Sequence, residues 1–443
     1  MTAIAGNAPA TLPAQRWRDP AAWLTTVDIC AVLVALSLPW STSLVAIFGA
    51  ALLITRIPFL DVRSFLQLLR QPICMAPIAL FLLACVGTLW SDASWATRLH
   101  AINPAVKLLM LPVLFYHFQR SERGLWVFIA FLVSCSLLAA MSWIVLFHPE
   151  LSFRQLDPEP GIFVKSHIQQ GQEFTLCAVA LAFPIIASLR AGKFAFAALL
   201  AAVVLNLLVN MAFVTVSRTA LVTMPIMLAV FGLLHLKLRT NLVIFAGLIV
   251  AAVAIWAVSP QLQDRIASFA RDYRIYKEDN LPSSIGSRLE FWEKSLRFFV
   301  EAPIIGHGSG STRGLFEQAA TAPAVLAGGQ VVSNPHNQTL NVAVQWGALG
   351  IAILFALWAV HLRLFRGETL ASWIGLLVVV QNIFTSLFNS HLFDFHEGWM
   401  YVLGVGVAGG MVLRAQATEP AQGLVPGSVS SPVQSPVQSP PGQ

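Results

Sequence analysis

The sequence predicts an all-α polytopic membrane protein with about 12 transmembrane helices and one large periplasmic loop that is itself helical. Three observations carry this prediction. Of the 443 residues, 57% are hydrophobic and only 11% are charged, which is far from the composition of a soluble domain. Apolar segments recur along the chain at lengths near that of a membrane-spanning helix. A single long polar stretch interrupts them.

Twelve apolar segments are candidates for spanning helices, because crossing the hydrocarbon core takes roughly 20 apolar residues, with a range of about 17 to 25. They are residues 22–39, 42–56, 73–90, 104–118, 125–147, 173–189, 194–213, 218–236, 241–258, 339–363, 369–389 and 397–414. The second and fourth are short, so each is also compatible with a tilted or re-entrant helix. Loss of either one would place the two termini on opposite sides of the membrane.

The distribution of positive charge predicts the orientation. With a cytoplasmic N-terminus, the cytoplasmic connections hold Arg16, Arg18, Arg56, Arg63, Arg70, Arg120, Arg123, Arg190, Lys193, Lys237, Arg239, Arg363, Arg366 and Arg414. The short loops on the other face hold only Arg98, Arg154, Lys165 and Arg218, with Lys107 just inside a span. Because lysine and arginine are enriched in cytoplasmic loops, both termini are expected in the cytoplasm.

The chain therefore divides into five predicted parts. These are a cytoplasmic N-terminus at 1–21, helices one to nine within 22–258, a large periplasmic loop at 259–338, helices ten to twelve within 339–415, and a disordered cytoplasmic tail at 416–443. The tail is rich in Pro, Ser, Gln and Val and has too little apolar content to fold. The first apolar run lacks a small-residue cleavage site and is expected to stay as an uncleaved span.

The long loop contains two predicted helices. Apolar residues at steps of three and four over 261–277 predict an amphipathic helix suited to the bilayer surface. The tetrapeptide 287–290, Ser-Arg-Leu-Glu, has the form of a capping box, so a second helix is expected to begin at Ser287. Pro303 and the glycines of 306–310 end that helix, and the glycine run is expected to form a turn.

Three arginines and one histidine stand out because each falls at the outer membrane boundary: Arg218, Arg265, Arg288 and His336. Arg288 is expected in the first turn of a helix, where unpaired N–H groups already favour an anion. A guanidinium offers paired donors that suit phosphate, and a neutral imidazole with a pKa of about 6.5 can accept a hydroxyl proton. Together they indicate a base facing a phosphate clamp. The alternative is that the arginines meet lipid phosphates and the histidine is a surface residue.

Other chemistry is not favoured by the sequence. The last outer loop holds His391, Asp394, His396 and Glu397, but their spacing fits no tetrahedral zinc pattern, and neither a metal nor another cofactor is expected. No Asp-x-Asp pair is present to hold a divalent ion on a sugar donor, so arginine would have to carry the phosphate charge. The net charge of +6 is dispersed between apolar segments, which argues against nucleic acid as a partner.

Four short motifs occur in a fixed order along the chain. They are Ser217-Arg218-Thr219-Ala220, then Ser287-Arg288 with Trp292, then Pro303-Ile304-Ile305-Gly306-His307-Gly308, then Pro335-His336-Asn337 leading into Leu340. This set resembles the O-antigen ligases of lipopolysaccharide assembly, which are related to O-antigen polymerases and protein O-oligosaccharyltransferases. The resemblance covers most of the chain, from the GT-C-like layout of spans to the loop.

The resemblance implies a glycosyltransferase of the bacterial inner membrane. Its donor would be a polysaccharide on undecaprenyl pyrophosphate, its acceptor a sugar hydroxyl of lipid A–core, and its route metal-independent, inverting and on the periplasmic face, in contact with membrane lipids. Arg218 and Arg288 would bind the pyrophosphate, and His336 would activate the acceptor hydroxyl. Arg265 matches no quoted motif and is added because an arginine on a surface helix could reach the same diphosphate. Secondary candidates are Asn337 and His167.

Two kinds of alternative remain open at this point. The motifs do not separate a ligase from an O-antigen polymerase or a protein O-oligosaccharyltransferase. A lipid-linked sugar flippase or another transporter belongs to a different class, and ionisable residues at mid-membrane on broken or repeated helices would favour it. Such residues are few here: Asp28 is the main acid within a predicted span, and no internal repeat is evident.

Overall fold

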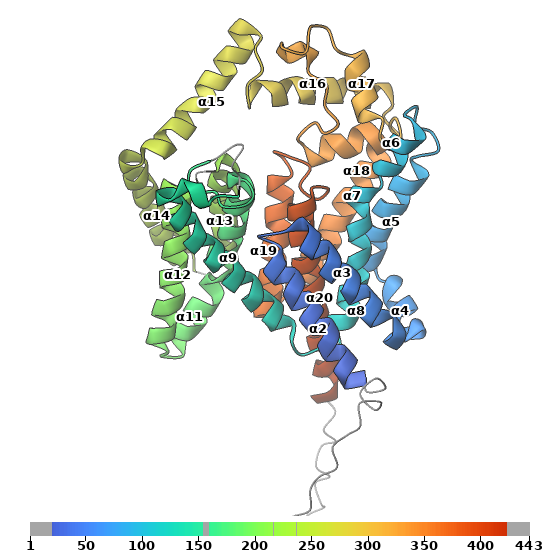
Figure 1. The fold of residues 1–443 in the computed structure, drawn as a ribbon. Helices are drawn as coiled ribbons and strands as arrows, with labels where there is room; N and C mark the ends of the chain where they lie inside the picture. The colour runs from blue at the N-terminus through green and yellow to red at the C-terminus, as the bar shows by residue number, and fades with distance from the viewer. Residues whose placement is uncertain (1–19, 154–158, 216, 236, 423–443) are drawn as a thin grey trace, which may run out of the picture.

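A computed structural model describes residues 20–153, 159–215, 217–235 and 237–422, and every regular element in these ranges is a helix (Figure 1). The predicted all-α fold is confirmed for this part of the chain. Eight segments are long and apolar enough to cross a membrane. A ninth is added if the pair Val62–Leu69 and Pro72–Val86, bent by 79°, forms one span.

The predicted number of about 12 full spans is therefore not reached. The eight segments are Thr42–Phe59, Trp95–Phe118, Gly124–Phe147, His167–Arg190, Phe194–Phe213, Leu238–Val258, Gln338–Leu364 and Phe395–Thr418. Three more predicted segments correspond to shorter apolar stretches of the described residues, Ala21–Ser37, Thr219–Leu234 and Leu370–Thr385. At about 1.5 Å per residue, a helix of 16 residues covers only about 24 Å of a hydrocarbon core about 30 Å thick.

The helices follow one another with short connections. They are α2 (Pro20–Ser37), α3 (Thr42–Arg56), α4 (Val62–Leu69), α5 (Pro72–Val86), α6 (Trp95–His100), α7 (Asn103–Val106), α8 (Met110–Phe118), α9 (Gly124–Phe147), α10 (His167–Ala180), α11 (Ala182–Arg190), α12 (Phe194–Phe213), α13 (Arg218–His235), α14 (Leu238–Val258), α15 (Pro260–Asp279), α16 (Gly286–Glu301), α17 (Thr312–Gln318), α18 (Gln338–Leu364), α19 (Leu370–Thr385) and α20 (Phe395–Gln422). Short 3-10 turns occupy Ile57–Phe59 (η1), Lys107–Leu109 (η2), Pro149–Leu151 (η3) and Ala327–Gly329 (η4).

The last helix, α20, is the centre of the apolar core and packs along α8 and α19. Its glycines let the helix backbones approach closely, as is common between membrane helices. A Cβ added at Gly406 would lie 2.7 Å from Leu114, and one added at Gly410 would lie 2.5 Å from Phe118. Substitution at either position would therefore push α8 away from the core.

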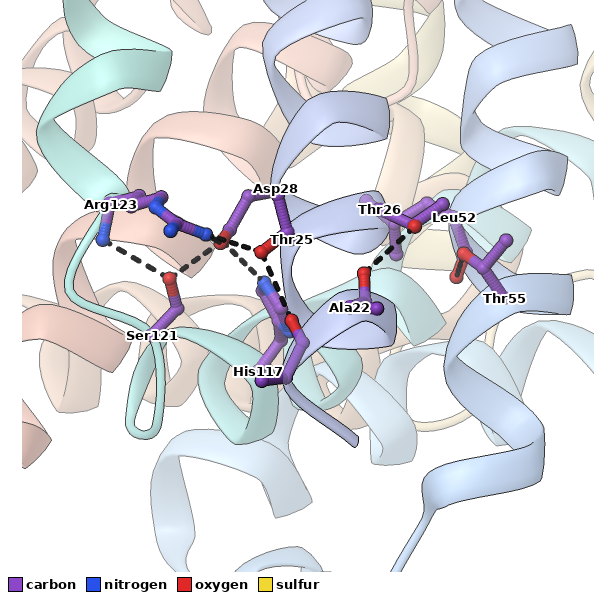
Figure 2. Close-up of polar contacts among 10 residues, drawn as sticks. Ala22, Thr25, Thr26, Asp28, Leu52, Thr55, His117, Ser121 and Arg123 are labelled. Atoms are coloured by element: carbon purple, nitrogen blue, oxygen red, sulfur yellow. Dashed lines mark hydrogen bonds and ion pairs between the residues drawn. The ribbon is translucent and has the colours of Figure 1, made fainter. Parts of the chain in front are cut away.

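One buried carboxylate joins the N-terminal helix to the rest of the bundle (Figure 2). Asp28 in α2 lies with Oδ1 2.8 Å from His117 Nε2 and accepts a hydrogen bond of 2.6 Å from the Ser121 hydroxyl. The Arg123 guanidinium approaches Oδ2 at 3.4 Å. These groups come from α8 and from the turn before α9. The contacts of Asp28 therefore hold α2 against both segments. Its burial does not by itself indicate a transport pathway.

The two predicted helices of the long loop are present as α15 and α16. Helix α15 begins at Pro260 after Ser259, whose hydroxyl accepts from Leu262 N–H, and it ends at Asp279, before Asn280 in the left-handed conformation. The predicted capping box at 287–290 is wrong, because α16 already begins at Gly286. The carboxylate of Glu290 instead accepts from the Tyr276 hydroxyl at 3.1 Å.

The glycine run of 306–310 forms the predicted turn, and it also fills a break in α18. At Gly347 the backbone of α18 leaves the helical region, with φ of 60°, which frees hydrogen-bonding groups on both sides. Gly308 N–H donates to Gln345 O at 2.8 Å, and Ala348 N–H donates to Pro303 O at 2.8 Å. The segment after α16 is thereby fixed to α18, the helix that follows His336.

Both ends of the chain reach beyond the described residues. Helix α20 continues to Gln422, so the predicted tail begins later than residue 416, and 416–422 are helical. The predicted disorder of the remaining tail, 423–443, and the predicted N-terminus up to residue 19 lie outside the described residues.

Candidate active site

A cavity of about 340 Å³ lies between the start of α16 and the loop before α18. Its lining residues are Pro282, Ser283, Ser284, Ser287, Arg288, Phe291 and His336. The structure thus brings Arg288 and His336, which are 48 positions apart in the sequence (336 − 288), to one hollow. The other lining groups are hydroxyls, a proline and an aromatic ring, a mixture suited to a polar ligand that carries sugar.

The backbone of His336 is held in an unusual conformation. Its φ is 54°, in the left-handed region that residues other than glycine rarely occupy. The His336 N–H donates to Asn334 Oδ1 at 2.9 Å, which closes a local turn around it. Its ring stacks on Phe291 of α16, with ring centres 6.1 Å apart and planes at 29°. Strained backbone of this kind clusters at functional sites, and here it presents the imidazole to the cavity.

A neighbouring amide selects the tautomer of His336. The ring atom Nδ1 lies 2.9 Å from Asn389 Oδ1, and the Asn389 amide nitrogen donates to Asp394 Oδ2 at 2.6 Å. An ionised carboxylate can only accept, and the Asn334 amide nitrogen donates to Asn389 Oδ1 at 3.0 Å, so Asn389 turns its nitrogen to Asp394 and its oxygen to His336. The oxygen can only accept, so Nδ1 carries the proton. Nε2 is then the basic atom of the ring.

The surroundings of His336 keep it neutral. Burial lowers the pKa of its imidazole, the hydrogen bond to Asn389 works in the opposite direction, and the positive charge of Arg288 lowers the pKa further. The pKa therefore lies below its ordinary value of about 6.5. At neutral pH the ring is uncharged and can accept a proton.

Arg288 stands in the first turn of α16, as the sequence predicts for the first turn of this helix. A cation near a helix N-terminus is electrostatically unfavourable unless an anion is also present. Its charge also lowers the pKa of the buried His391, which burial, the largest cause, brings to about 4. The positive charge of Arg288 reaches both histidines. This end of the cavity is therefore electrostatically suited to an anion such as a diphosphate.

The side chains of two predicted phosphate ligands lie outside the described residues. Arg218 is the first residue of α13, and Arg265 belongs to α15. Figure 1 shows α15 running from the end of α14 toward α16, above the group of helices that includes α13. The roles of both arginines stay predictions. The motif around Arg218 is packed on α10, because a Cβ added at Gly171 would lie 2.9 Å from Ser217 Cβ.

The two secondary candidates have other partners in the structure. Asn337 is the N-cap of α18: its Oδ1 accepts from Leu340 N–H at 3.1 Å, and its amide donates to Leu387 O at 3.3 Å. It therefore positions the backbone beside His336. His167 Nδ1 lies 2.8 Å from a carboxylate oxygen of Glu159. The structure does not place His167 among the residues that line the cavity.

The last outer loop contains partners of His336 that the sequence does not predict. The sequence predicts no role for Asn389 and offers Asp394 only as a metal ligand. In the structure His396 pairs with Glu173 at 2.7 Å and lies 2.6 Å from the Lys165 ammonium. No group of three metal-ligating side chains is placed to hold an ion in the part of the chain described here. A polar Asn-Ser-His run between two apolar spans was the signal available in the sequence.

Comparison with known proteins identifies the region that contains this cavity. Residues 201–355 match the protein family described as O-Antigen ligase (Wzy_C). The match covers about a third of the chain, and it is this stretch that is similar to the family. The resemblance inferred from the ordered motifs is confirmed over this stretch, which includes Arg218, Arg265, Arg288 and His336. A comparison with curated proteins finds no match.

The family assignment agrees with the apolar helices. Members of this family are membrane glycosyltransferases that transfer lipid-linked glycans, and the chain has the multi-pass helical form that such a protein needs. Glycan transfer is therefore the activity of the family that residues 201–355 resemble, and the helices of the described residues give the chain a multi-pass form. The finer assignment of donor, acceptor and residue roles is taken up as a proposal.

Proposed function

We propose that this protein is an O-antigen ligase that transfers a polysaccharide from undecaprenyl pyrophosphate to a sugar hydroxyl of lipid A–core. The single observation that carries the proposal is the presence of Arg288 and His336 on one polar cavity within the O-antigen ligase family domain. A base and a cation that face the same hollow suit a reaction in which a hydroxyl attacks and a diphosphate leaves.

The proposed reaction is an inverting displacement. His336 Nε2 accepts the proton of the acceptor hydroxyl while its oxygen forms a bond to the anomeric carbon of the donor. The bond between that carbon and the phosphate oxygen breaks, and undecaprenyl pyrophosphate leaves with the electron pair. Arg288 stabilises the negative charge that grows on the leaving group, with Arg218 and Arg265 as further predicted ligands. This scheme needs no metal ion or cofactor.

An apolar cavity supports a donor with a long hydrocarbon chain. It has a volume of about 320 Å³ and is lined by residues of α9, α10, α11, α12, α19 and α20, among them Phe131, Leu181 and Val378. Nearly all of its surface is hydrocarbon, so an isoprenoid chain would be a suitable occupant. Holding both lipid substrates at one membrane depth would orient them before they react, which lowers the entropic part of the activation barrier.

The proposed orientation follows from charge. Lysine and arginine concentrate in the connections that alternate with the Arg288 and His336 face, so these connections and both termini are placed in the cytoplasm. The cavity then faces the periplasm of the bacterial inner membrane, where the two lipid substrates would meet.

Deleting the gene in the bacterium that encodes this chain tests the proposal. We expect lipid A–core without polysaccharide, together with full-length glycan that accumulates on undecaprenyl pyrophosphate in the periplasmic leaflet. Loss of a polymerase would instead leave single repeat units on lipid A–core. Loss of a protein glycosyltransferase would leave lipopolysaccharide unchanged, and loss of a flippase would keep the lipid-linked glycan on the cytoplasmic side. Any of these three outcomes would contradict the ligase assignment.

A further inference from the structure

A buried lysine holds the loop that orients His336. Lys107 lies in η2 and is only 7% exposed. Its ammonium donates to Phe393 O at 2.9 Å and also to Asp394 O. A charged group removed from water needs partners of this kind, and here the partners are main-chain oxygens of the segment that joins α19 to α20.

The first turn of α20 leaves room for this ammonium. At Gly398 an added Cβ would lie 2.4 Å from Lys107 Nζ and 2.3 Å from Lys107 Cε, distances too short for any real contact. The lysine therefore reaches the two carbonyls only because residue 398 has no side chain. Substitution at Gly398 would therefore displace the ammonium without removing it, and it would also press on the Leu392 carbonyl, which lies 2.5 Å from the same Cβ.

A continuous set of contacts leads from Lys107 to the base. The side chain of Asp394 accepts from the Asn389 amide at 2.6 Å, and Asn389 Oδ1 lies 2.9 Å from His336 Nδ1. The charged groups that act on the Asp394 carboxyl are Glu397 of α20 and Lys107 of η2. Burial raises the pKa of this carboxyl to about 7, Glu397 adds to the increase, and Lys107 opposes it.

We propose that Lys107 is a positioning residue for His336: it fixes the main chain at 393–394 and favours the ionised Asp394 carboxyl, which holds the Asn389 nitrogen so that the Asn389 oxygen faces Nδ1. Its effect on rate rests on the proposed function, whereas its effect on the tautomer of His336 does not. Lys107 itself makes no contact with the cavity lining, and its role is exerted through Asp394 and Asn389.

The consequence of losing the ammonium can be derived from hydrogen-bond donors. Without the positive charge the pKa of the Asp394 carboxyl rises above about 7, so the group is mostly protonated at neutral pH. A protonated carboxyl can donate to the Asn389 oxygen, which allows the amide to turn its nitrogen toward His336 at the cost of the 3.0 Å hydrogen bond that the Asn334 amide donates to that oxygen. Nδ1 becomes the acceptor, and Nε2, now protonated, can no longer act as the base. Raising the pH ionises Asp394 and restores the original arrangement.

The test is the Lys107→Met variant, with Gly398→Ala as a second way to move the ammonium. In purified protein, ¹⁵N spectra of labelled histidine report the tautomer of His336, whose signal is assigned by its absence in His336→Ala. We expect mainly protonated Nδ1 in the wild type. We expect a larger share of protonated Nε2 in Lys107→Met at neutral pH, which reverts toward the wild-type form at about pH 9. The same tautomer in both proteins across this range would overturn the proposal.

Transfer kinetics provide the second readout. We expect kcat to fall roughly 10-fold to 100-fold at neutral pH in Lys107→Met, the range typical when the partner behind an orienting histidine is lost. The donor KM should stay unchanged, and the deficit should shrink as the pH rises. Lys165→Met is the matched control, because its ammonium lies against His396 at 2.6 Å and not against Asp394. Any decrease in kcat in Lys165→Met should be the same at every pH.

The tautomer measurement and the kinetics together distinguish failure of the ligase proposal from failure of the Lys107 proposal. A wild-type protein without transfer activity but with the expected tautomer change would contradict the ligase proposal and support the role of Lys107. A wild-type ligase in which Lys107→Met lowers kcat equally at all pH values would show that Lys107 only stabilises the fold, and would overturn the proposal.

Discussion

His336→Ala is expected to slow transfer by about 100-fold to 10,000-fold, the range typical of a lost general base, while donor binding stays nearly unchanged. The reason is that the imidazole is assigned to the acceptor hydroxyl and the arginines to the diphosphate. The measurement is single-turnover transfer in proteoliposomes beside equilibrium binding of undecaprenyl pyrophosphate. His148→Ala is a suitable control, because His148 is an exposed histidine that pairs with Glu150 at 3.0 Å.

The pH profile adds a check on the same residue. Burial and Arg288 lower the pKa of His336, so its neutral form, which is the base, persists at pH values where an ordinary histidine is protonated. The transfer rate should therefore stay on its plateau down to below about pH 6.5 and fall only under more acidic conditions. Near wild-type transfer by a well-expressed His336→Ala protein would remove the base from this mechanism.

Arg288→Ala is expected to weaken donor binding and also to lower the rate, by about 100-fold to 1000-fold if Arg288 acts like one oxyanion donor. Arg288→Lys should recover only part of this loss, because an ammonium cannot reproduce the paired donors of a guanidinium. The measurement is kcat and KM for the lipid-linked donor. Arg313→Ala serves as the control, since Arg313 is exposed on α17 and pairs with Glu317 at 2.9 Å.

Loss of Arg288 should also move the pH profile. Its charge lowers the pKa of His336, so removing it raises that pKa, and the acid limb of the residual activity shifts to higher pH. An Arg288→Ala protein with unchanged donor KM, unchanged kcat and an unshifted acid limb would show that this guanidinium does not act on the donor or on the base.

Local features of the fold could be predicted from the sequence because local chemistry determines them. The amphipathic period of 261–277 predicted α15, and the apolar runs predicted the ends of α14 and α18 to within a few residues. Fewer full spans are found in the described part of the chain than the apolar runs predict, because such a run does not show how long its helix is. Helix α19, for example, is apolar but has only 16 residues.

The missed features depend on contacts between distant parts of the chain. The break of α18 at Gly347 is stabilised by carbonyl and amide groups of the turn after α16, which no local pattern reveals. The orientation of His336 depends on Asn389, and the loop of Asn389 depends on Lys107 from η2. A sequence pattern can identify an arginine and a histidine as candidates, but only the fold shows which side chains contact and orient them.

The most direct test of the central claim is reconstituted transfer. Purified protein in liposomes would receive a polysaccharide on undecaprenyl pyrophosphate and lipid A–core that lacks polysaccharide, with EDTA present throughout. Gel mobility and mass spectrometry would then measure the polysaccharide on lipid A–core and the free undecaprenyl pyrophosphate. We expect the two products in equal amounts, from the wild type and not from His336→Ala. Polysaccharide that stays on its lipid carrier, or transfer that appears only when manganese or magnesium replaces the chelator, would contradict this account.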